Sequence, residues 1–271
     1  MQTVFSAAQI AAHCTQKTRQ AVAIEVVSET GSTNLDLLAR LQGPPSAMLK
    51  QATLLVAERQ TQGKGRAGRV WHSASSATDG SSLTFSLAWP FSRSLQELVG
   101  LPLAVGVAVA QALDAQAVQV KLKWPNDILR DGQKLGGILI ASVSQSADLQ
   151  WAVIGVGLNL AVSAALEAQI GHKVADARWL AQQDGNLLMA TLLDHLVTVL
   201  QSFEQTGMAA FVDCWQQWHA HQGMAVQIID HGQLLHQGVA IGVDSSGCLL
   251  LDTAQGQVAV LAGDVSLRAD A

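Results

Sequence analysis

Cysteine and charge are both scarce in this chain of 271 residues. The cysteines, Cys14, Cys214 and Cys248, are odd in number and far apart, so neither a disulfide framework nor a Cys-x-x-Cys redox or zinc site is indicated. A reducing, cytoplasmic setting fits this pattern. Charged residues make up 14% and apolar residues 49%, a balance that is typical of a globular protein and excludes a disordered chain.

The chain also lacks a surplus of cations and a signal peptide. A net charge of -5 argues against general nucleic-acid binding, because few cations are available to neutralise phosphates. No basic segment precedes an apolar stretch at the amino terminus. The charge-free run 98–113 is shorter than the roughly 20 residues that a bilayer requires, so it predicts a buried helix. We therefore expect no DNA partner and no membrane partner.

Apolar periodicity predicts a mixed α+β main domain. Before Val22 we expect a short amphipathic helix at best. Predicted strands cover 22–27, 53–57, 83–89, 118–122, 127–129, 137–144 and 151–157, and predicted helices cover 34–41, 96–113, 186–204 and 208–219. From about Gly223 short apolar runs alternate with turn signals, which is typical of a small antiparallel barrel. The predicted domains are 1–222 and 223–271.

One loop carries most of the positive charge that the sequence concentrates in one place. Behind the apolar run 53–57 it reads Gly63-Lys64-Gly65-Arg66-Ala67-Gly68-Arg69. Glycines let backbone N–H groups approach an anion, and cations add charge-assisted hydrogen bonds. A Walker loop is excluded because Glu58 and Gly65 stand where Gly and Ser/Thr are required, and a dinucleotide fingerprint is excluded because no helical pattern or acidic partner follows. Taken alone, the loop could equally be a solvated basic turn.

Other blocks along the chain favour a binding function for this loop over a solvated turn. They are Ser32-Thr33-Asn34, Lys123-Trp124-Pro125-Asn126-Asp127, Lys134-Leu135-Gly136-Gly137-Ile138-Leu139 and Gly155-Val156-Gly157-Leu158-Asn159. With the loop, in this order and at these intervals, they resemble the biotin protein ligases over about half of the chain. Agreement of several separate blocks is far more specific than any one of them.

The resemblance implies a fold and a reaction. It implies a catalytic domain like that of class II aminoacyl-tRNA synthetases, followed by an SH3-like carboxyl-terminal domain. The implied substrates are biotin, ATP with Mg²⁺, and a lysine of a biotin carboxyl carrier protein, with biotinyl-5'-AMP as the intermediate. About 30 residues precede Ser32, too few for a helix-turn-helix domain as well as the first strand, so we expect a ligase without DNA-binding duty, either monomeric or homodimeric.

The resemblance also assigns roles to individual positions. Lys134, Arg66 and Asp127 are the implied catalytic residues. The implied biotin-binding set is Ser32, Thr33, Asn34, Gln60, Gly63, Lys64, Gly65, Arg66, Lys134, Gly136 and Gly137. The implied ATP-binding set is Arg66, Arg69, Trp71, Lys123, Asn126, Asn159 and Trp179. Ala67 departs from the family's double-arginine pattern. Lys64 replaces the commoner arginine, and because lysine is a point donor instead of a planar fork, this affects bidentate contacts by that side chain but not contacts by the backbone.

Several roles stay open at the level of sequence. Asp127 either accepts a proton from the incoming lysine or forms a turn that holds Lys123. Ser32 to Asn34 can cap a helix as well as bind a ligand. Cys214, His219 and His221 invite a metal site, but their spacing needs a break in the helix, and we expect no protein-bound metal. The alternative functions are lipoate or octanoate attachment and a biotin-binding regulatory module.

Overall fold

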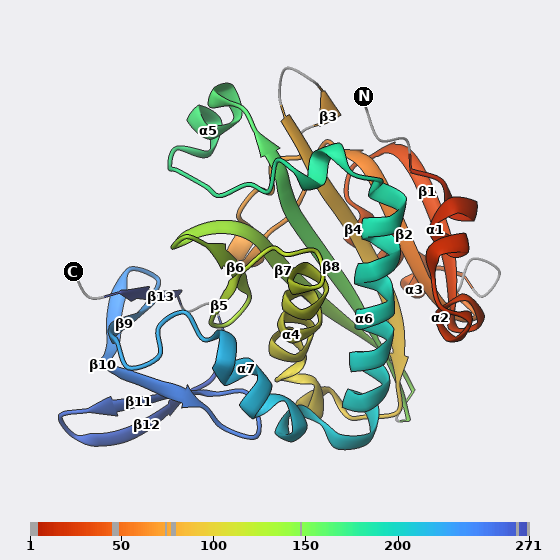
Figure 1. Cartoon of the computed structure of the whole chain (residues 1–271). Coiled ribbons are helices and arrows are strands. Elements are labelled where there is room, and N and C mark those ends of the chain that lie inside the picture. Colours follow the sequence, from red (N-terminus) through yellow and green to blue (C-terminus); the bar gives the residue numbers. More distant parts are fainter. Residues whose placement is uncertain are drawn as a thin grey trace.

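The computed structural model describes residues 5–44, 49–73, 75–76, 80–146, 148–263 and 266–269. Within these residues the chain forms two sheets, a large one covered by helices and a smaller one near the carboxyl terminus (Figure 1). The large sheet contains β1 (Val22–Thr30), β2 (Ala52–Gln60), β3 (Ser75–Ser76), β4 (Gly80–Phe91), β5 (Lys121–Lys123), β6 (Asp127–Arg130), β7 (Gln133–Ser146) and β8 (Leu149–Val162).

The strand order of the large sheet is β1-β2-β4-β8-β7-β6-β5, with β3 paired to β4. Only β1 and β2 run parallel among these pairs, and the other neighbours are antiparallel. The central strands β4 and β8 are the most apolar and are almost wholly buried, as expected for strands covered on both faces. This mixed sheet confirms the α+β class predicted from the sequence.

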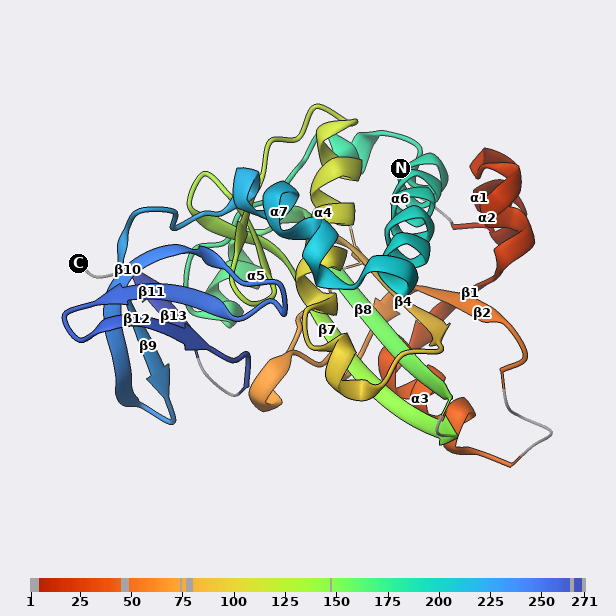
Figure 2. The same ribbon diagram turned by 90° about the horizontal axis from the view of Figure 1, so that it is seen from below.

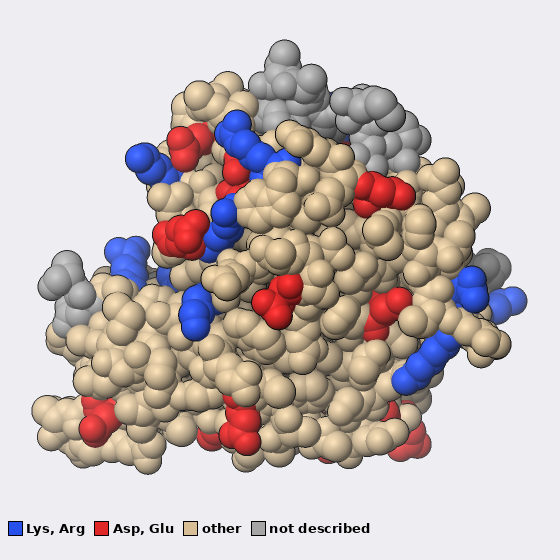
Figure 3. All heavy atoms as spheres, in the orientation of Figure 1, with Lys and Arg blue, Asp and Glu red and all other residues tan. Residues whose placement is uncertain are grey.

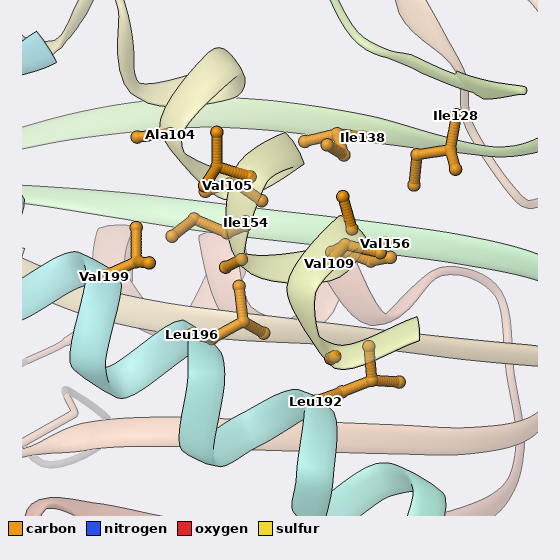
Figure 4. Close-up of a cluster of buried hydrophobic side chains, with 14 of the residues drawn as sticks. Ala104, Val105, Val109, Ile128, Ile138, Ile154, Val156, Leu192, Leu196 and Val199 are labelled. Atoms are coloured by element: carbon orange, nitrogen blue, oxygen red, sulfur yellow. The ribbon is translucent and has the colours of Figure 1, made fainter. Parts of the chain in front are cut away.

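One face of the sheet is covered by α4 (Leu101–Asp114) and α6 (Gly185–Thr206). Val105 and Val109 of α4 lie in one buried cluster with Leu196 of α6 and with sheet residues such as Ile154 and Val156 (Figure 4). By length and composition, 95–114 and 185–206 are apolar enough to cross a membrane, yet 67% and 61% of these windows are buried inside the fold. Packing against the sheet accounts for their apolar character.

The opposite face carries α3 (Thr33–Gln42). Leu37 and Leu41 of this helix pack on Leu55, Trp151 and Val153 of the sheet.

The amino-terminal α1 (Ala7–His13) and α2 (Gln16–Ala21) are two short helices where at most one was predicted, and both contact α6. Asn186 at the start of α6 accepts from the Ser6 backbone N–H at 2.8 Å, which fixes α1 against it.

Some predicted boundaries were wrong for identifiable reasons. The helix predicted at 96–113 is divided into a 3-10 turn, Leu95–Leu98, and α4, because Pro102 lies at the start of a new helix after Gly100. The helix predicted at 208–219 is likewise a 3-10 turn, Met208–Phe211, followed by α7 (Val212–Trp218). The strand predicted at 118–122 is reduced to β5, and α5 (Ala164–Ile170) was not predicted. Part of the Ser-rich segment 72–82, predicted to be flexible, lies outside the described residues.

The smaller sheet begins at Ala225. Its strands are β9 (Ala225–Asp230), β10 (Gln233–Val243), β11 (Leu249–Thr253), β12 (Gly256–Val260) and β13 (Ser266–Ala269), in the antiparallel order β12-β11-β10-β9-β13. This meander is consistent with the predicted SH3-like domain, and Figure 2 shows it beside α7 and the end of the large sheet. The buried indole of Trp124 donates to the Gly247 carbonyl at 3.1 Å, which connects the small sheet to the main body.

Candidate functional site

The glycine-rich loop lies between β2 and β3 and folds back on itself. The Trp71 N–H donates to the Gly63 carbonyl at 2.9 Å, and the Gly65 N–H donates to the Arg69 carbonyl at 2.7 Å. Ala67 and Gly68 both adopt positive φ, 51° and 70°. The loop is therefore a compact turn whose cations project beside the end of the large sheet.

This loop borders a cavity of about 640 Å³. The start of α3, the end of β2, the sheet strands β4, β6, β7 and β8, the segment after α5 and strand β13 supply the other walls. Most of the predicted site residues line it: Ser32, Thr33, Asn34, Gln60, Lys64, Gly65, Arg66, Arg69, Trp71, Lys123, Asn126, Asp127, Lys134, Gly137 and Asn159. Residues from five distant blocks of sequence thus meet in one place.

Three predicted residues do not line this cavity. At Gly63 an added Cβ would lie 2.4 Å from the Trp71 carbonyl, and at Gly136 it would lie 2.5 Å from the Gly157 carbonyl. These two glycines permit close backbone approach instead of facing a ligand. Trp179 packs against the core, and its ring stacks with the guanidinium of Arg130 at 4.2 Å. Its contact with the nucleotide therefore stays a prediction.

One end of the cavity is polar and uncharged. Ser32 occupies the N-cap position of α3 but makes no side-chain capping bond, so its hydroxyl is not used by the helix. Gln60 accepts from both the backbone N–H and the hydroxyl of Thr33, at 2.8 and 3.1 Å. Asn34 donates through its amide nitrogen to the Leu139 carbonyl at 3.2 Å. Such a fixed set of amides and hydroxyls is suited to a neutral polar head group.

The other end is cationic. Lys134 and Asp127 form an ion pair with Nζ and Oδ1 2.5 Å apart. Arg66 donates to the Asn126 side-chain oxygen at 2.9 Å and to the Gly263 carbonyl, which follows β12 of the small sheet. Burial lowers the pKa of Lys123, and the charges of Lys134, Arg69 and Arg268 lower it further, while Asp127 opposes them. This mutual repulsion is relieved when an anion enters.

Between the two ends the cavity is lined by Gly155 and Gly157 of β8, which we call the glycine floor. The indole of Trp71 lies on Gly157 of β8, where an added Cβ would be 2.5 Å from the ring. Gly155 similarly accommodates the Asn34 amide, which would lie 2.7 Å from a Cβ. The Trp71 Nε1 atom is buried and has no hydrogen-bond partner among the described residues.

Other residues line the cavity without having been assigned a substrate-binding or catalytic role from the sequence. Those that stand in the quoted blocks are Ile138, Leu139, Gly155, Val156 and Gly157. His221 was considered only as a metal ligand. The others are Val70, His72, Phe85, Ser86, Leu129, Gly132, Gln133, Ile170, His172, Lys173, Val174, Arg268 and Ala269. The spacing Gly155-x-Gly157 on a buried strand is a signal of close ligand approach that could have indicated the floor. His221, Arg268 and Ala269 reach the cavity only through the packing of the small sheet, which no local pattern reveals.

Cys214, His219 and His221 do not form a metal centre. Among the described residues no group of three or more His, Cys, Asp or Glu side chains is arranged to hold a metal ion. The Nδ1 atom of His219 lies 3.0 Å from the Gln222 side-chain oxygen, and burial lowers the pKa of this imidazole. Burial, Lys123 and His219 together lower the pKa of His221 to about 4.

The fold and the cavity define a protein ligase of the biotin and lipoate class. Residues 26–159 match the Biotin/lipoate A/B protein ligase family, and residues 221–268 match the Biotin protein ligase C terminal domain. The chain belongs to the biotin protein ligase family. It is 31% identical to the bifunctional ligase/repressor BirA of Escherichia coli over 90% of this chain and 74% of that protein. It is 32% identical to the biotin--[acetyl-CoA-carboxylase] ligase of Mycobacterium tuberculosis, with coverage of 89% and 88%.

Solved structures agree with these relatives. The biotin protein ligase from Aquifex aeolicus in complex with biotin and ATP superposes with a TM-score of 0.72 at 25% identity, over 91% of this chain and 99% of that one. That protein was therefore seen with both small substrates bound. Its likeness extends across the large sheet and the small one.

Proposed function

We propose that this protein is an ATP-dependent biotin protein ligase that makes biotinyl-5'-AMP and transfers biotin to a carrier-protein lysine. The observation that carries this function is one cavity with an uncharged polar end, a glycine floor and a cationic end. A cyclic urea, an apolar ring and chain, and a carboxylate joined to a phosphate match these three parts in order. Family membership supports the same assignment.

The first step joins an acid to a nucleotide. A carboxylate oxygen of biotin attacks the α-phosphorus of ATP, the bond from that phosphorus to the bridging oxygen breaks, and pyrophosphate leaves. Negative charge is redistributed between the two substrates, and fixed cations stabilise such a transition state. We assign this role to Lys134 and Arg66, with Lys123, Arg69 and Asn126 toward the phosphates.

The second step transfers the acyl group. The ε-amine of the carrier lysine attacks the carbonyl carbon of the mixed anhydride, the bond to the phosphate oxygen breaks, AMP leaves, and the amine loses a proton. The Asp127 carboxylate is held 2.5 Å from Lys134, so it orients that cation, and it also lines the cavity into which the carrier amine must reach. This geometry supports a role for Asp127 beyond turn formation.

The remaining assignments concern binding. We assign Ser32, Thr33, Asn34 and Gln60 to the ureido group, and Gly137 to the ring and chain of biotin. Trp71, expected from the resemblance to bind ATP, is assigned to the ring and chain as well, because its indole lies on Gly157 in the middle of the cavity. Asn159 donates to the carbonyls of Lys134, at 3.5 Å, and of Ala175, at 3.2 Å, so it holds the wall of the nucleotide end. With no three-residue metal cluster among the described residues, Mg²⁺ is expected to arrive with ATP, held largely by phosphates.

The acceptor follows from the relatives. Ligases named for acetyl-CoA carboxylase support a biotin carboxyl carrier protein as the substrate of this chain. We further propose a cytoplasmic location and residues 223–271 as a second domain. The oligomeric state, monomer or homodimer, is to be measured by light scattering with and without biotinyl-5'-AMP.

Biotin-dependent exchange of labelled pyrophosphate into ATP tests the function. We expect exchange with biotin and little with lipoate or octanoate, because a ureido group is needed to satisfy the amides at the polar end. Exchange supported equally by octanoate would favour lipoate attachment. Biotin binding without any exchange would instead favour a regulatory module.

A further inference from the structure

Ser86 is a buried hydroxyl on the polar wall of the cavity that neither the motifs nor the family blocks single out. It lies on β4, opposite Gly155 of β8 and Leu55 of β2. Its side chain is fully buried from bulk solvent yet lines the cavity. Its Oγ atom is 2.7 Å from the hydroxyl of Thr33.

The direction of each hydrogen bond at this wall can be deduced. A backbone N–H only donates, so the Gln60 atom 2.8 Å from the Thr33 nitrogen must be the amide oxygen. That oxygen only accepts, so the single hydroxyl proton of Thr33 is donated to it across 3.1 Å. The bond between Thr33 and Ser86 is therefore donated by Ser86, whose one proton is committed to Thr33.

These internal hydrogen bonds determine which donors and acceptors of the wall remain for a ligand. The Gln60 Nε2 group is left as a donor. Ser86 Oγ, with its proton used, is left only as an acceptor. The Leu139 carbonyl fixes the nitrogen of the Asn34 amide, which leaves the Asn34 oxygen as a second acceptor. One donor and two acceptors complement a cyclic urea, which has one carbonyl oxygen and two N–H groups.

We infer that Ser86 is a specificity-determining residue that accepts a hydrogen bond from one of the two ureido N–H groups of biotin. The inference rests on the proposed function and extends it, because it assigns a separate partner to each polar atom of the head group. Thr33 and Gln60 hold the proton of Ser86 away from the cavity. A site built this way rejects a ligand that lacks the matching N–H, since the acceptor is then left unpaired.

The test compares biotin with its two N-methyl isomers, each lacking a different ureido N–H. Pyrophosphate exchange is measured for the wild-type protein and for Ser86→Ala. We expect Ser86→Ala to raise the KM for biotin about 5- to 10-fold, the value of one hydrogen bond, with little change in kcat or in the KM for ATP. Preference for biotin over one isomer should fall by about the same factor, and preference over the other isomer should stay as in the wild type.

Two further variants keep the result interpretable. Thr84→Val removes another buried hydroxyl of β4, one that donates to the Ala57 carbonyl at 3.1 Å and does not line the cavity. It should change stability but neither isomer preference. Ser86→Cys, with similar volume and a poor sulfur acceptor, should reproduce the isomer-selective loss if Ser86→Ala does not fold.

The outcomes distinguish a failure of the proposed ligase function from a failure of the role of Ser86. Wild-type protein without biotin-dependent exchange refutes the proposed function. An active wild type, combined with Ser86 variants in which the KM values for biotin and both isomers move in parallel or not at all, refutes the role of Ser86 alone. Loss of preference over one isomer only supports it.

Discussion

At the scale of single residues, Lys134 is held by a counter-ion before any substrate is present. Its Nζ atom is 2.5 Å from the Asp127 carboxylate, and both side chains are partly exposed to the cavity. The pair keeps the ammonium at the cationic end, where it can exchange Asp127 for a substrate anion. Lysine contributes a point charge here, and no other ammonium of the described cavity wall has this ion pair.

Replacing Lys134 with alanine should therefore lower the rate of adenylate formation by about 10²- to 10³-fold, the usual cost of removing one group that stabilises a transition state. The measurement is biotin-dependent pyrophosphate exchange, with circular dichroism to verify the fold. Lys17→Ala is the matched control, because Lys17 is exposed on α2 and lies outside the cavity. Full exchange by the Lys134 variant would remove this residue from the mechanism.

The buried His221 predicts a pH dependence of stability. Its pKa falls from 6.5 to about 4 in the folded protein, chiefly because burial penalises the charged imidazole and secondarily because Lys123 and His219 lie nearby. Between pH 6.5 and pH 4 the unfolded chain protonates this imidazole more readily than the folded protein does. The contribution of His221 to the free energy of unfolding is therefore fully present above pH 6.5 and is lost as the pH falls toward 4.

His221→Phe should flatten this dependence, since the phenyl ring cannot be protonated. The free energy of unfolding of the wild-type protein should decrease by roughly 2 kcal/mol more than that of the variant between pH 7 and pH 4. Urea unfolding at a series of pH values measures the difference. Identical slopes in the two proteins would show that other groups control acid sensitivity.

At the scale of elements, the glycines of β7 and β8 have two different functions. Gly136 permits the two strands to approach, because its Cβ position is occupied by the Gly157 carbonyl. Gly157 also makes room for the Trp71 indole on the cavity side. Both blocks could be recognised in the sequence, but the division of labour between adjacent glycines depends on the register of the strands.

Gly157→Ala should displace the Trp71 indole, because the new Cβ would lie 2.5 Å from the ring. Contacts closer than 3 Å force a shift, so we expect biotin affinity to fall at least about tenfold while the sheet still forms. Isothermal titration calorimetry gives the affinity, and Gly31→Ala, where a Cβ meets nothing within 4 Å, serves as control. Equal affinities in the two variants would contradict the floor.

At the scale of the whole molecule, charged side chains are few, and several of the basic ones are concentrated in the cavity. On the face drawn in Figure 3, basic and acidic side chains are scattered over a surface that is mostly uncharged. The cations that matter, including Lys123, Lys134 and Arg66, gather in the cavity. Net composition could exclude a broad nucleic-acid surface, yet only the fold brings these cations together.

This difference explains how far the sequence alone could lead. Gly- and Lys-containing blocks such as Lys134 to Leu139 identify one wall of the site each, and their order predicts the catalytic fold. Arg268 and His221 could not be predicted, because they reach the cavity through the docking of the small sheet on the large one. The partner of Trp179 could not be predicted for a related reason, since Arg130, from a distant part of the sequence, lies over its ring.

Docking of the small sheet depends on a buried contact that can be removed by itself. Trp124 is 1% exposed and donates to the Gly247 carbonyl at 3.1 Å, while Gly247 lies so close to Gly100 that a Cβ would be 2.8 Å from its Cα atom. Because the carbonyl is buried, loss of its donor leaves it unpaired at a cost of about 1 to 3 kcal/mol. Loss of this hydrogen bond therefore weakens the contact between the small sheet and the main body.

Trp124→Phe keeps most of the ring packing and removes only the donor, so it should loosen the small sheet before the main body unfolds. We expect urea unfolding, followed by hydrogen exchange of β9 to β13, to show earlier opening of these strands and weaker ATP binding, because Arg268 and Ala269 lose their place in the cavity wall. Trp151→Phe, which removes a 3.0 Å indole bond to Gln145 within the main domain, should lower stability without selective opening. If both variants open the small sheet alike, Trp124 does not couple the two, and the position of Arg268 must depend on the linker and on contacts such as that of Arg66 with Gly263.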